Sequence, residues 1–176
     1  TAGHRDVLEM REGLKPERYN MRLARPDPLV PRSLRFGITE RLRADGRVEK
    51  HLDHDSVLAA IARLKAAAVE SVAVCYLHAY RDPRHEVETR EILAREMPGI
   101  TVSLSSDVLP QIKEYERVST TVVNAYVGPL IELYLGRLET QLQEAGFAGP
   151  LLIILSHGGV APVSQAAKVA ASTVLS

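Results

Sequence analysis

Hydrophobic positions repeat with a period of two in some stretches of the chain and with a period near 3.6 in others, so strands and helices are predicted in turn. Alternation over residues 34–42 predicts a half-buried strand. The Asp45-Gly46 turn signal, followed by Val48, predicts the return strand of a hairpin. Further strands are predicted at residues 71–77, 100–105 and 151–155.

Helices are predicted between these strands. A carboxylate at Asp53 or Asp55 can cap a helix whose apolar face includes Val57, Leu58, Ile61 and Leu64. Asp82-Pro83 is typical of a helix start, and we expect that helix to run to about Met97. A last helix is predicted at residues 162–171.

The longest predicted helix follows the segment 114–117 and keeps its apolar spacing from Val123 until Gly146. Pro129 lies inside that pattern, where a proline removes one backbone donor and clashes with the preceding turn. We therefore expect the helix to be kinked or split, at a cost of about 3 kcal/mol if nothing compensates.

Strands that alternate with helices predict an α/β fold class, with a mainly parallel or mixed sheet and flanking helices, over residues 33–176. Residues 1–32 are polar and punctuated by Pro16, Pro26, Pro28 and Pro31, which predicts an extended proline-rich arm. The chain begins without Met and stops without a cap or a polar tail, so we interpret it as a segment of a longer protein.

Net charge, the length of apolar runs and the cysteine content exclude some classes of function. The formal net charge is +0, so no basic field is present to hold nucleic acid or an anionic membrane. The longest wholly apolar run, residues 151–155, is far too short to span a bilayer. The one cysteine, Cys75, suits a reducing compartment, and no signal peptide is visible, so a cytoplasmic protein is predicted. We interpret Cys75 as a small buried thiol.

His78, His85 and Glu86 are candidate metal ligands, because imidazole and carboxylate groups suit divalent cations. Their spacing is not that of a zinc protease, which needs a second histidine one turn along the helix. The alternative is that His78 orders the loop after its strand and that Glu86 complements the helix dipole.

Glu114, Arg117 and Asn124 are candidate substrate-binding residues. The planar fork of an arginine matches a carboxylate bidentately. The alternative for Glu114 and Arg117 is a solvated helix start with local ion pairs. A buried amide such as Asn124 must be hydrogen-bonded, so it either pins two elements together or faces a ligand.

Ser156, Gly158 and Gly159 follow a predicted strand directly. Glycines at such a position allow backbone N–H groups to approach an anion, which makes these residues candidates for nucleotide binding. The alternative is a tight turn. Ile154 stands where a nucleophile elbow needs glycine, and no lysine follows as in a P-loop.

The segments 77–86, 114–127 and 155–159, in this order and at these separations, resemble the hydantoinase A / 5-oxoprolinase family, which includes subunits of ATP-dependent ketone carboxylases. Residues 1–9 and 28–32 resemble the same family. The family usually has Ser-Asn-Gly-Gly where this chain has Ser156-His157-Gly158-Gly159, so His157 is a departure.

The resemblance implies a segment of an actin-like ATPase-type fold, in which ATP lies between two lobes and is held by an Asp-Gly-Gly-Thr-type loop in each. Neither loop occurs in these residues, so the segment alone is expected to bind no cofactor and to be inactive. The intact enzyme would use ATP and Mg, and a hydantoinase B-type subunit or domain would be its partner.

The resemblance also implies the reaction. We expect an ATP-dependent hydrolase that opens a cyclic amide, either 5-oxoproline or a hydantoin-like ring. One alternative is a subunit of an ATP-dependent acetone- or acetophenone-type carboxylase. Another is a non-catalytic docking module, for which the long helix with Tyr126 and Tyr134 on one flank is suited.

Overall fold

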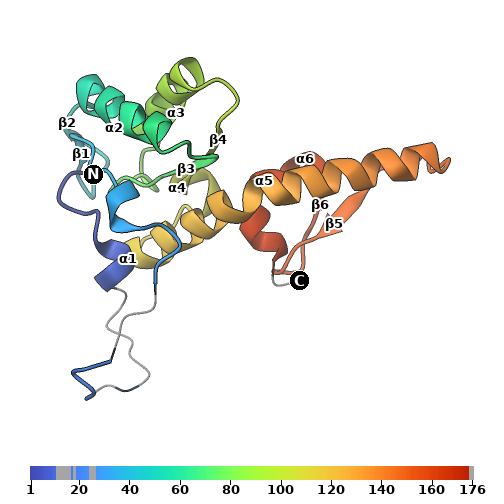
Figure 1. The fold of residues 1–176 in the computed structure, drawn as a ribbon, viewed down its shortest axis with the longest axis horizontal. Helices are drawn as coiled ribbons and strands as arrows, with labels where there is room; N and C mark the ends of the chain where they lie inside the picture. The colour runs from blue at the N-terminus through green and yellow to red at the C-terminus, as the bar shows by residue number, and fades with distance from the viewer. Residues whose placement is uncertain (11–16, 18, 24–26, 175–176) are drawn as a thin grey trace.

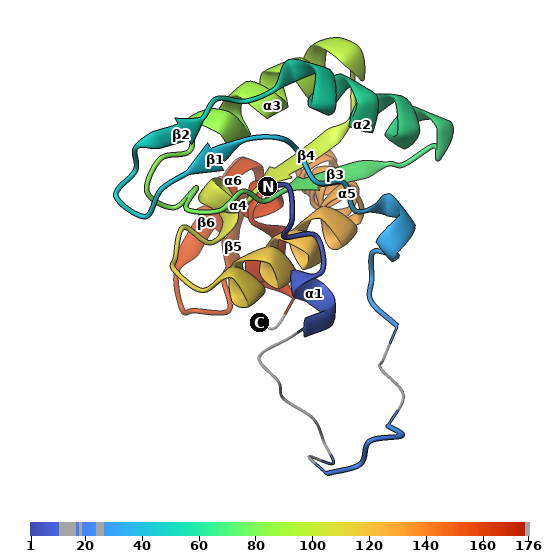
Figure 2. The same ribbon diagram turned by 90° about the vertical axis from the view of Figure 1, so that its left-hand side faces the viewer.

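The computed structural model describes residues 1–10, 17, 19–23 and 27–174. Its main body contains three layers, in which helices α2 (His54–Ala66) and α3 (Arg84–Glu96) lie on one side of strands β3 (Ser71–Val74) and β4 (Thr101–Leu104). The first part of helix α5 (Glu114–Glu144) lies on the other side (Figure 2). The remainder of α5 projects from this body beside the C-terminal elements (Figure 1).

Strands β3 and β4 are parallel and pair in register from Ser71 with Thr101 to Val74 with Leu104. Helix α3 connects them, as a parallel pair requires. Asp53 caps α2 by accepting a hydrogen bond from the Asp55 amide at 3.2 Å, as predicted. Apolar side chains of α2, α3, β3 and β4 form the main core.

The predicted hairpin is present but short. Strands β1 (Arg41–Leu42) and β2 (Val48–Lys50) pair antiparallel, and the prediction of a strand over residues 34–40 is wrong. That stretch begins in the 3-10 turn η1 (Arg32–Leu34). Its backbone makes isolated hydrogen bonds in place of a ladder, for example from the Ala2 amide to the Ile38 carbonyl. Ile38 is nevertheless buried, so the period of two correctly predicted an inward-facing side chain.

The predicted arm is only partly described, because Pro16 and Pro26 lie outside the described residues. Its first residues include the short helix α1 (Val7–Met10), which contacts α5. Arg32 and Asp6 form an ion pair at 2.9 Å. The division of the chain at residue 32 stays a prediction.

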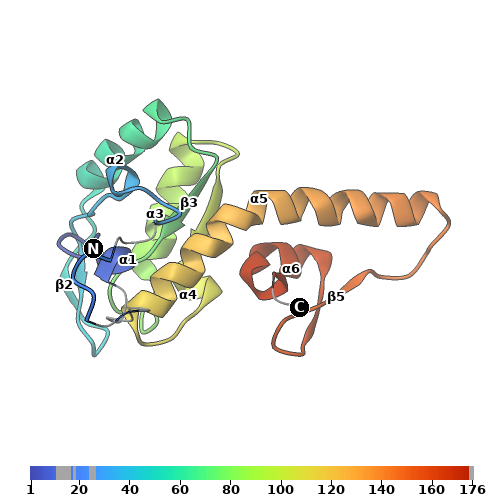
Figure 3. The same ribbon diagram turned by 60° about the horizontal axis from the view of Figure 1, so that its bottom comes forward.

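Helix α5 remains one helix of 31 residues with Pro129 inside it, after the short helix α4 (Ser105–Val108). Figure 3 shows that α5 bends in its middle and does not break. The predicted kink is therefore present and the predicted split is not.

The C-terminal elements form a second, smaller unit. Strands β5 (Leu152–Ile154) and β6 (Val160–Pro162) pair antiparallel and are followed by α6 (Val163–Lys168) and the 3-10 turn η2 (Ala170–Thr173). The helix predicted over residues 162–171 is thus divided into α6 and η2. Leu152 and Ile154 are 53% and 66% exposed, so the prediction that this strand is buried is wrong.

Of the two-stranded sheets in the described part of the chain, one is parallel and two are antiparallel. The α/β class is confirmed, but the strands form three short separate sheets and not one mixed or mainly parallel sheet. Within the same residues, no helix combines the length and the apolar character needed to cross a bilayer.

Candidate functional site

Arg117 lies at the start of α5 and is only 1% exposed. Its Nη1 donates to the Gln111 carbonyl and its Nη2 donates to the Tyr76 carbonyl, each at 3.0 Å. The guanidinium also lies over the ring of Tyr80, 5.4 Å from the ring centre. Arg117 is therefore not part of a solvated surface, although Lys113 and Glu116 beside it do form a local ion pair at 3.1 Å.

Asn124 joins three elements. Its Nδ2 donates to Ser103 Oγ on β4 at 2.9 Å and to the Lys168 carbonyl at 3.1 Å, and its Oδ1 accepts from the Ala171 amide at 3.0 Å. The side chain is 2% exposed. Of the two roles expected for this amide, the contacts show the pinning of elements, and substrate binding by Asn124 stays a prediction.

Replacing Asn124 with alanine should lower the free energy of unfolding by about 1–3 kcal/mol, because the buried Ser103 hydroxyl and two part-buried backbone groups, at Lys168 and Ala171, would lose their hydrogen bonds. Urea unfolding of the variant measures this. Thr140→Ala on the same helix is the matched control, since its hydroxyl is exposed and bonds only within the helix, and a change within about 0.5 kcal/mol is expected. Equal unfolding midpoints for the wild type and N124A would contradict the structural role.

Glu86 is fully buried at the start of α3. Its carboxylate accepts hydrogen bonds from the Tyr76 amide at 2.8 Å, from Ser105 Oγ at 2.6 Å and from the Ser106 amide at 2.9 Å. Burial raises the pKa of this carboxyl group, and the three donors oppose that rise. Glu86 therefore ties the end of β3 to the start of α4.

The raised pKa of Glu86 predicts a pH dependence of stability. The folded state holds the proton more tightly than the unfolded state, so this contribution to stability is complete below the ordinary pKa of about 4.3 and is lost as pH rises through the raised pKa. Glu86→Gln removes the titration. The difference in unfolding free energy between wild type and variant should therefore fall as pH rises over that range, and a difference independent of pH would contradict it.

His85 and His78 have separate partners. The His85 Nδ1 lies 2.8 Å from the Glu40 carboxylate, and both side chains are buried. His78 has a positive φ of 59°, and its carbonyl accepts from the Arg81 amide at 2.8 Å. The backbone of His78 thus helps to form the loop after β3, while its Nδ1 is buried without a hydrogen-bond partner, so an ordering role of its side chain stays a prediction.

In the part of the chain that the structure describes, no group of three or more His, Cys, Asp or Glu side chains is arranged to hold a metal ion. His85 and Glu86 are each bonded to protein partners instead. Metal binding by His78, His85 and Glu86 stays a prediction to which the geometry adds no support.

The turn between β5 and β6 contains Ser156, Gly158 and Gly159. Gly158 has a φ of +88°, which glycine adopts without strain, and its amide donates to the Leu155 carbonyl at 2.8 Å. The Leu155 amide donates to the Gly159 carbonyl, and the Ser156 amide and hydroxyl both donate to the Ser172 carbonyl. The tight turn is confirmed, and nucleotide binding by Ser156, Gly158 and Gly159 stays a prediction.

Hydrogen bonds around the first half of α5 link members of the three predicted groups, namely the candidate metal ligands, the candidate substrate-binding residues and the candidate nucleotide-binding residues. The Tyr76 amide bonds to Glu86 and the Tyr76 carbonyl bonds to Arg117. Further along the helix, Asn124 holds η2, and η2 in turn holds Ser156. The motifs far apart in the sequence therefore belong to one polar frame, which is buried at Glu86, Arg117 and Asn124 and exposed at Ser156.

The frame includes residues that the sequence did not single out, namely Glu40, Tyr76, Ser103 and Ser105. Ser103 lies in the strand β4 and Ser105 directly follows it. A hydroxyl side chain in or next to an apolar strand needs a hydrogen-bond partner, and this is the one signal in the sequence that could have indicated these two residues as members of the frame.

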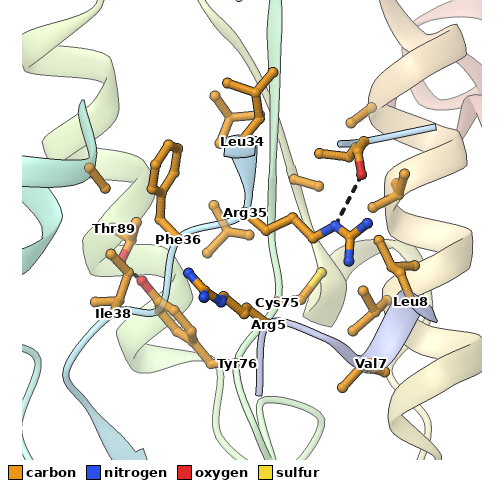
Figure 4. A pocket seen from close by; sticks show the side chains of 18 of the residues that line it. Arg5, Val7, Leu8, Leu34, Arg35, Phe36, Ile38, Cys75, Tyr76 and Thr89 are labelled. Carbon is orange, nitrogen blue, oxygen red and sulfur yellow. Dashed lines mark hydrogen bonds between the residues drawn. The ribbon is translucent and has the colours of Figure 1, made fainter. Parts of the chain in front are cut away.

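A cavity lies beside β3, with about 290 Å³ accessible to the centres of water molecules (Figure 4). Residues of α2, α5, β3 and the segments before β1 line it, and half-buried Glu114 is among them. Arg35 donates to the Val30 carbonyl at 3.0 Å and pairs with Glu9 at 3.1 Å. Burial raises the pKa of the Cys75 thiol to about 12, which is not the environment of a nucleophile.

Two family models match the chain. The model of the hydantoinase/oxoprolinase N-terminal region matches residues 1–97, and the hydantoinase/oxoprolinase model matches residues 117–176. The chain is similar to the caprolactamase subunit alpha of Pseudomonas jessenii, with 37% identity over 92% of this chain and 24% of that protein. It is also similar to the acetophenone carboxylase gamma subunit of Aromatoleum aromaticum, with 30% identity over 93% of this chain and 24% of that protein.

Comparison with solved structures finds relatives of the same kinds. The crystal structure of the ATP-dependent caprolactamase from Pseudomonas jessenii matches with a TM-score of 0.84 and 37% identity, over 93% of this chain and 24% of that chain. The nucleotide-free structure of acetone carboxylase matches with a TM-score of 0.77 and 29% identity, over 87% and 22%. The chain spans about a quarter of the length of these relatives.

Proposed function

Because the chain belongs to the hydantoinase/oxoprolinase family, we propose that the full-length protein is an ATP-dependent hydrolase that opens a cyclic amide, such as 5-oxoproline or a hydantoin-like ring. The observation that carries the proposal is the similarity to an ATP-dependent caprolactamase. Caprolactamase matches in structure with a TM-score of 0.84, against 0.77 for acetone carboxylase. In sequence, the 37% identity to caprolactamase exceeds the 30% identity to the acetophenone carboxylase subunit.

The chemistry of a cyclic amide explains why such an enzyme would need ATP. Amide resonance makes the ring carbonyl a poor electrophile, and ATP supplies the activation that lets water attack it. The turn at residues 155–159 does not offer enough backbone donors for a whole triphosphate, since the amides of Leu155, Ser156 and Gly158 are already bonded. We therefore assign Ser156, Gly158 and Gly159 at most one contact with an anionic group of the nucleotide.

We propose that the polar frame around α5 holds this helix in place, and that Glu114 faces the substrate. Arg117 and Asn124 donate to carbonyls or a hydroxyl of the protein, so they set the position of α5 against β3, β4 and η2. Glu114 precedes them on α5, is half-buried and lines the cavity. Among the three predicted substrate-binding residues, it is therefore the one that we propose to contact the substrate.

A role in docking is the second candidate. Tyr126, Leu130, Leu133 and Tyr134 are at least half exposed on α5 and follow helical spacing along one side. Several relatives are named as subunits, among them the beta subunit of the acetone carboxylase from Xanthobacter autotrophicus. A hydantoinase B-type subunit or domain is the partner that we propose for this side of α5.

ATP turnover by the full-length protein with that partner tests the function. We expect 5-oxoproline or hydantoin to raise the rate of ADP formation at least about tenfold, while acetone with bicarbonate does not. Stimulation by acetone and bicarbonate alone would favour the carboxylase alternative, and stimulation by no substrate would favour the docking module.

The 176-residue segment by itself should show no ATP turnover, because phosphoryl transfer depends on loops that position the phosphates and the sequence has no Asp-Gly-Gly-Thr-type loop. The assay compares the segment with the full-length protein at equal concentration. Metal-dependent turnover by the purified segment would contradict the assignment of its residues to positioning.

A further inference from the structure

Three buried side chains hold the backbone of Tyr76 and Leu77, just beyond the end of β3. The Tyr76 amide donates to Glu86 at 2.8 Å, and the Tyr76 carbonyl accepts from Arg117 at 3.0 Å. The Leu77 amide donates to Thr1 Oγ1 at 2.9 Å. Side chains from three distant segments therefore fix the chain at the point where it leaves the sheet.

Thr1 is itself held in place. Its hydroxyl donates to the Glu40 carboxylate, whose other oxygen lies 2.8 Å from His85 Nδ1. Gly37 allows the first residues to approach, because a Cβ at this position would lie 3.1 Å from the Ala2 Cα. Thr1, Glu40 and His85 are each more than nine-tenths buried. A buried polar network whose groups are paired makes the backbone around it rigid, so the end of β3 has one fixed geometry.

His78 comes next in the chain, and it has a strained backbone. Its φ of 59° lies in the left-handed region, where a residue with a Cβ is uncommon and where glycine or asparagine is accommodated more easily. Strained residues persist where the surrounding structure over-determines them, and they cluster at ligand sites. The bonds that hold Tyr76 and Leu77 supply that support.

Within the described residues, the imidazole of His78 makes no hydrogen bond. Its ring packs edge-on against Tyr80, with 6.0 Å between the ring centres, and Tyr80 in turn lies beneath the Arg117 guanidinium. Nδ1 is buried without a partner, whereas the half-buried side chain leaves Nε2 accessible. A buried N–H donor without a partner is rarer than an unpaired acceptor, so we expect the ring hydrogen on Nε2. Nε2 is then a donor that can reach a ligand.

We propose that His78 contacts the substrate, with Nε2 donating a hydrogen bond to the ring carbonyl oxygen of the cyclic amide. The inference rests on the proposed function. His78 follows a parallel strand, and open α/β sheets bind ligands beyond the carboxyl ends of such strands. Arg117, which holds Tyr76, lies one helical turn after Glu114 on α5. A lactam presents a carbonyl acceptor and an N–H donor side by side, which His78 and Glu114 would complement.

Two substitutions in the full-length protein with its partner subunit test which ring nitrogen is used. The side-chain amide nitrogen of His78→Gln can take the place of Nε2, whereas that of His78→Asn can take only the place of Nδ1. We expect KM for 5-oxoproline, measured through ADP formation, to rise at least about tenfold in H78N and less than about threefold in H78Q. The Tm of both variants should stay within about 3 °C of the wild type.

Ala68→Asn is the matched control, because Ala68 also has a positive φ, of 49°, but is exposed at the end of α2. Its KM should equal that of the wild type. Equal KM values for the wild type and H78N, or equal rises in H78N and H78Q, would overturn the proposal.

Two further outcomes separate this proposal from its premise. A fall in Tm of more than about 8 °C in both His78 variants, with KM unchanged, would assign His78 to packing against the rest of the protein and overturn the contact. A wild type whose ATP turnover responds to neither 5-oxoproline nor hydantoin would remove the proposed function, and this role of His78 with it.

Discussion

Replacing Glu86 with leucine is expected to lower the free energy of unfolding by about 3–5 kcal/mol, since a buried donor left without a partner costs roughly 1–3 kcal/mol. Glu86 accepts hydrogen bonds from three donors, at Tyr76, Ser105 and Ser106, and leucine accepts none. Leucine has a similar volume, so a cavity adds little. Denaturant unfolding followed by circular dichroism measures the loss.

Glu88→Leu, two positions along the same helix, is the control. Glu88 pairs with His54 at 2.6 Å, but both side chains are largely exposed, and such pairs contribute about 0–1 kcal/mol. If E86L and E88L had the same small effect, Glu86 would not join β3 to α4, and the polar frame around α5 would lose its first member.

Replacing Arg117 with methionine is expected to cost about 2–4 kcal/mol, because the buried Tyr76 carbonyl and the part-buried Gln111 bond each lose a charged donor and the contact with the Tyr80 ring is lost. Arg117→Lys should recover part of this loss, since an ammonium group can reach one carbonyl but cannot span both as the planar fork does.

Kinetics on the full-length R117K protein separate positioning from substrate binding. If Arg117 acts only through its backbone partners, the lysine variant loses thermal stability while KM for the cyclic amide stays within about twofold at a temperature well below its Tm. Arg90→Lys is the control, because Arg90 is exposed and pairs with Asp107. A large rise in KM without loss of stability would instead place Arg117 on the substrate.

The sequence predicted the elements whose signals are local. Asp53 caps α2 as expected. Helix α3 begins one residue later than the Asp82-Pro83 signal suggests, but the Asp82 carboxylate still accepts from the Arg84 amide at 3.0 Å. Apolar spacing placed most of α5 and its end before Gly146, although the helix already begins at Glu114, inside the segment that it was predicted to follow. These features depend on residues within a few positions of one another, which a single sequence displays.

Features that depend on distant partners were not predictable. The period of two over residues 34–42 was correct for the buried Ile38 but not for Arg35, which is buried as well. A strand also needs a neighbour along its length, and only Arg41–Leu42 has one. Arg117 stands between glutamates at a helix start, a pattern typical of a solvated surface. Its burial follows from the Tyr76 carbonyl, 41 positions earlier in the chain, and nothing local indicates that contact.

The measurement that tests the proposed function most directly is the fate of a labelled ring. Full-length protein with its partner subunit is incubated with ATP and 13C-labelled 5-oxoproline, and carbon NMR follows the carbonyl signal. The proposal predicts that glutamate appears together with an equal amount of ADP. A labelled ring that stays closed, while acetone and bicarbonate are joined into a β-keto acid at the expense of ATP, would contradict it.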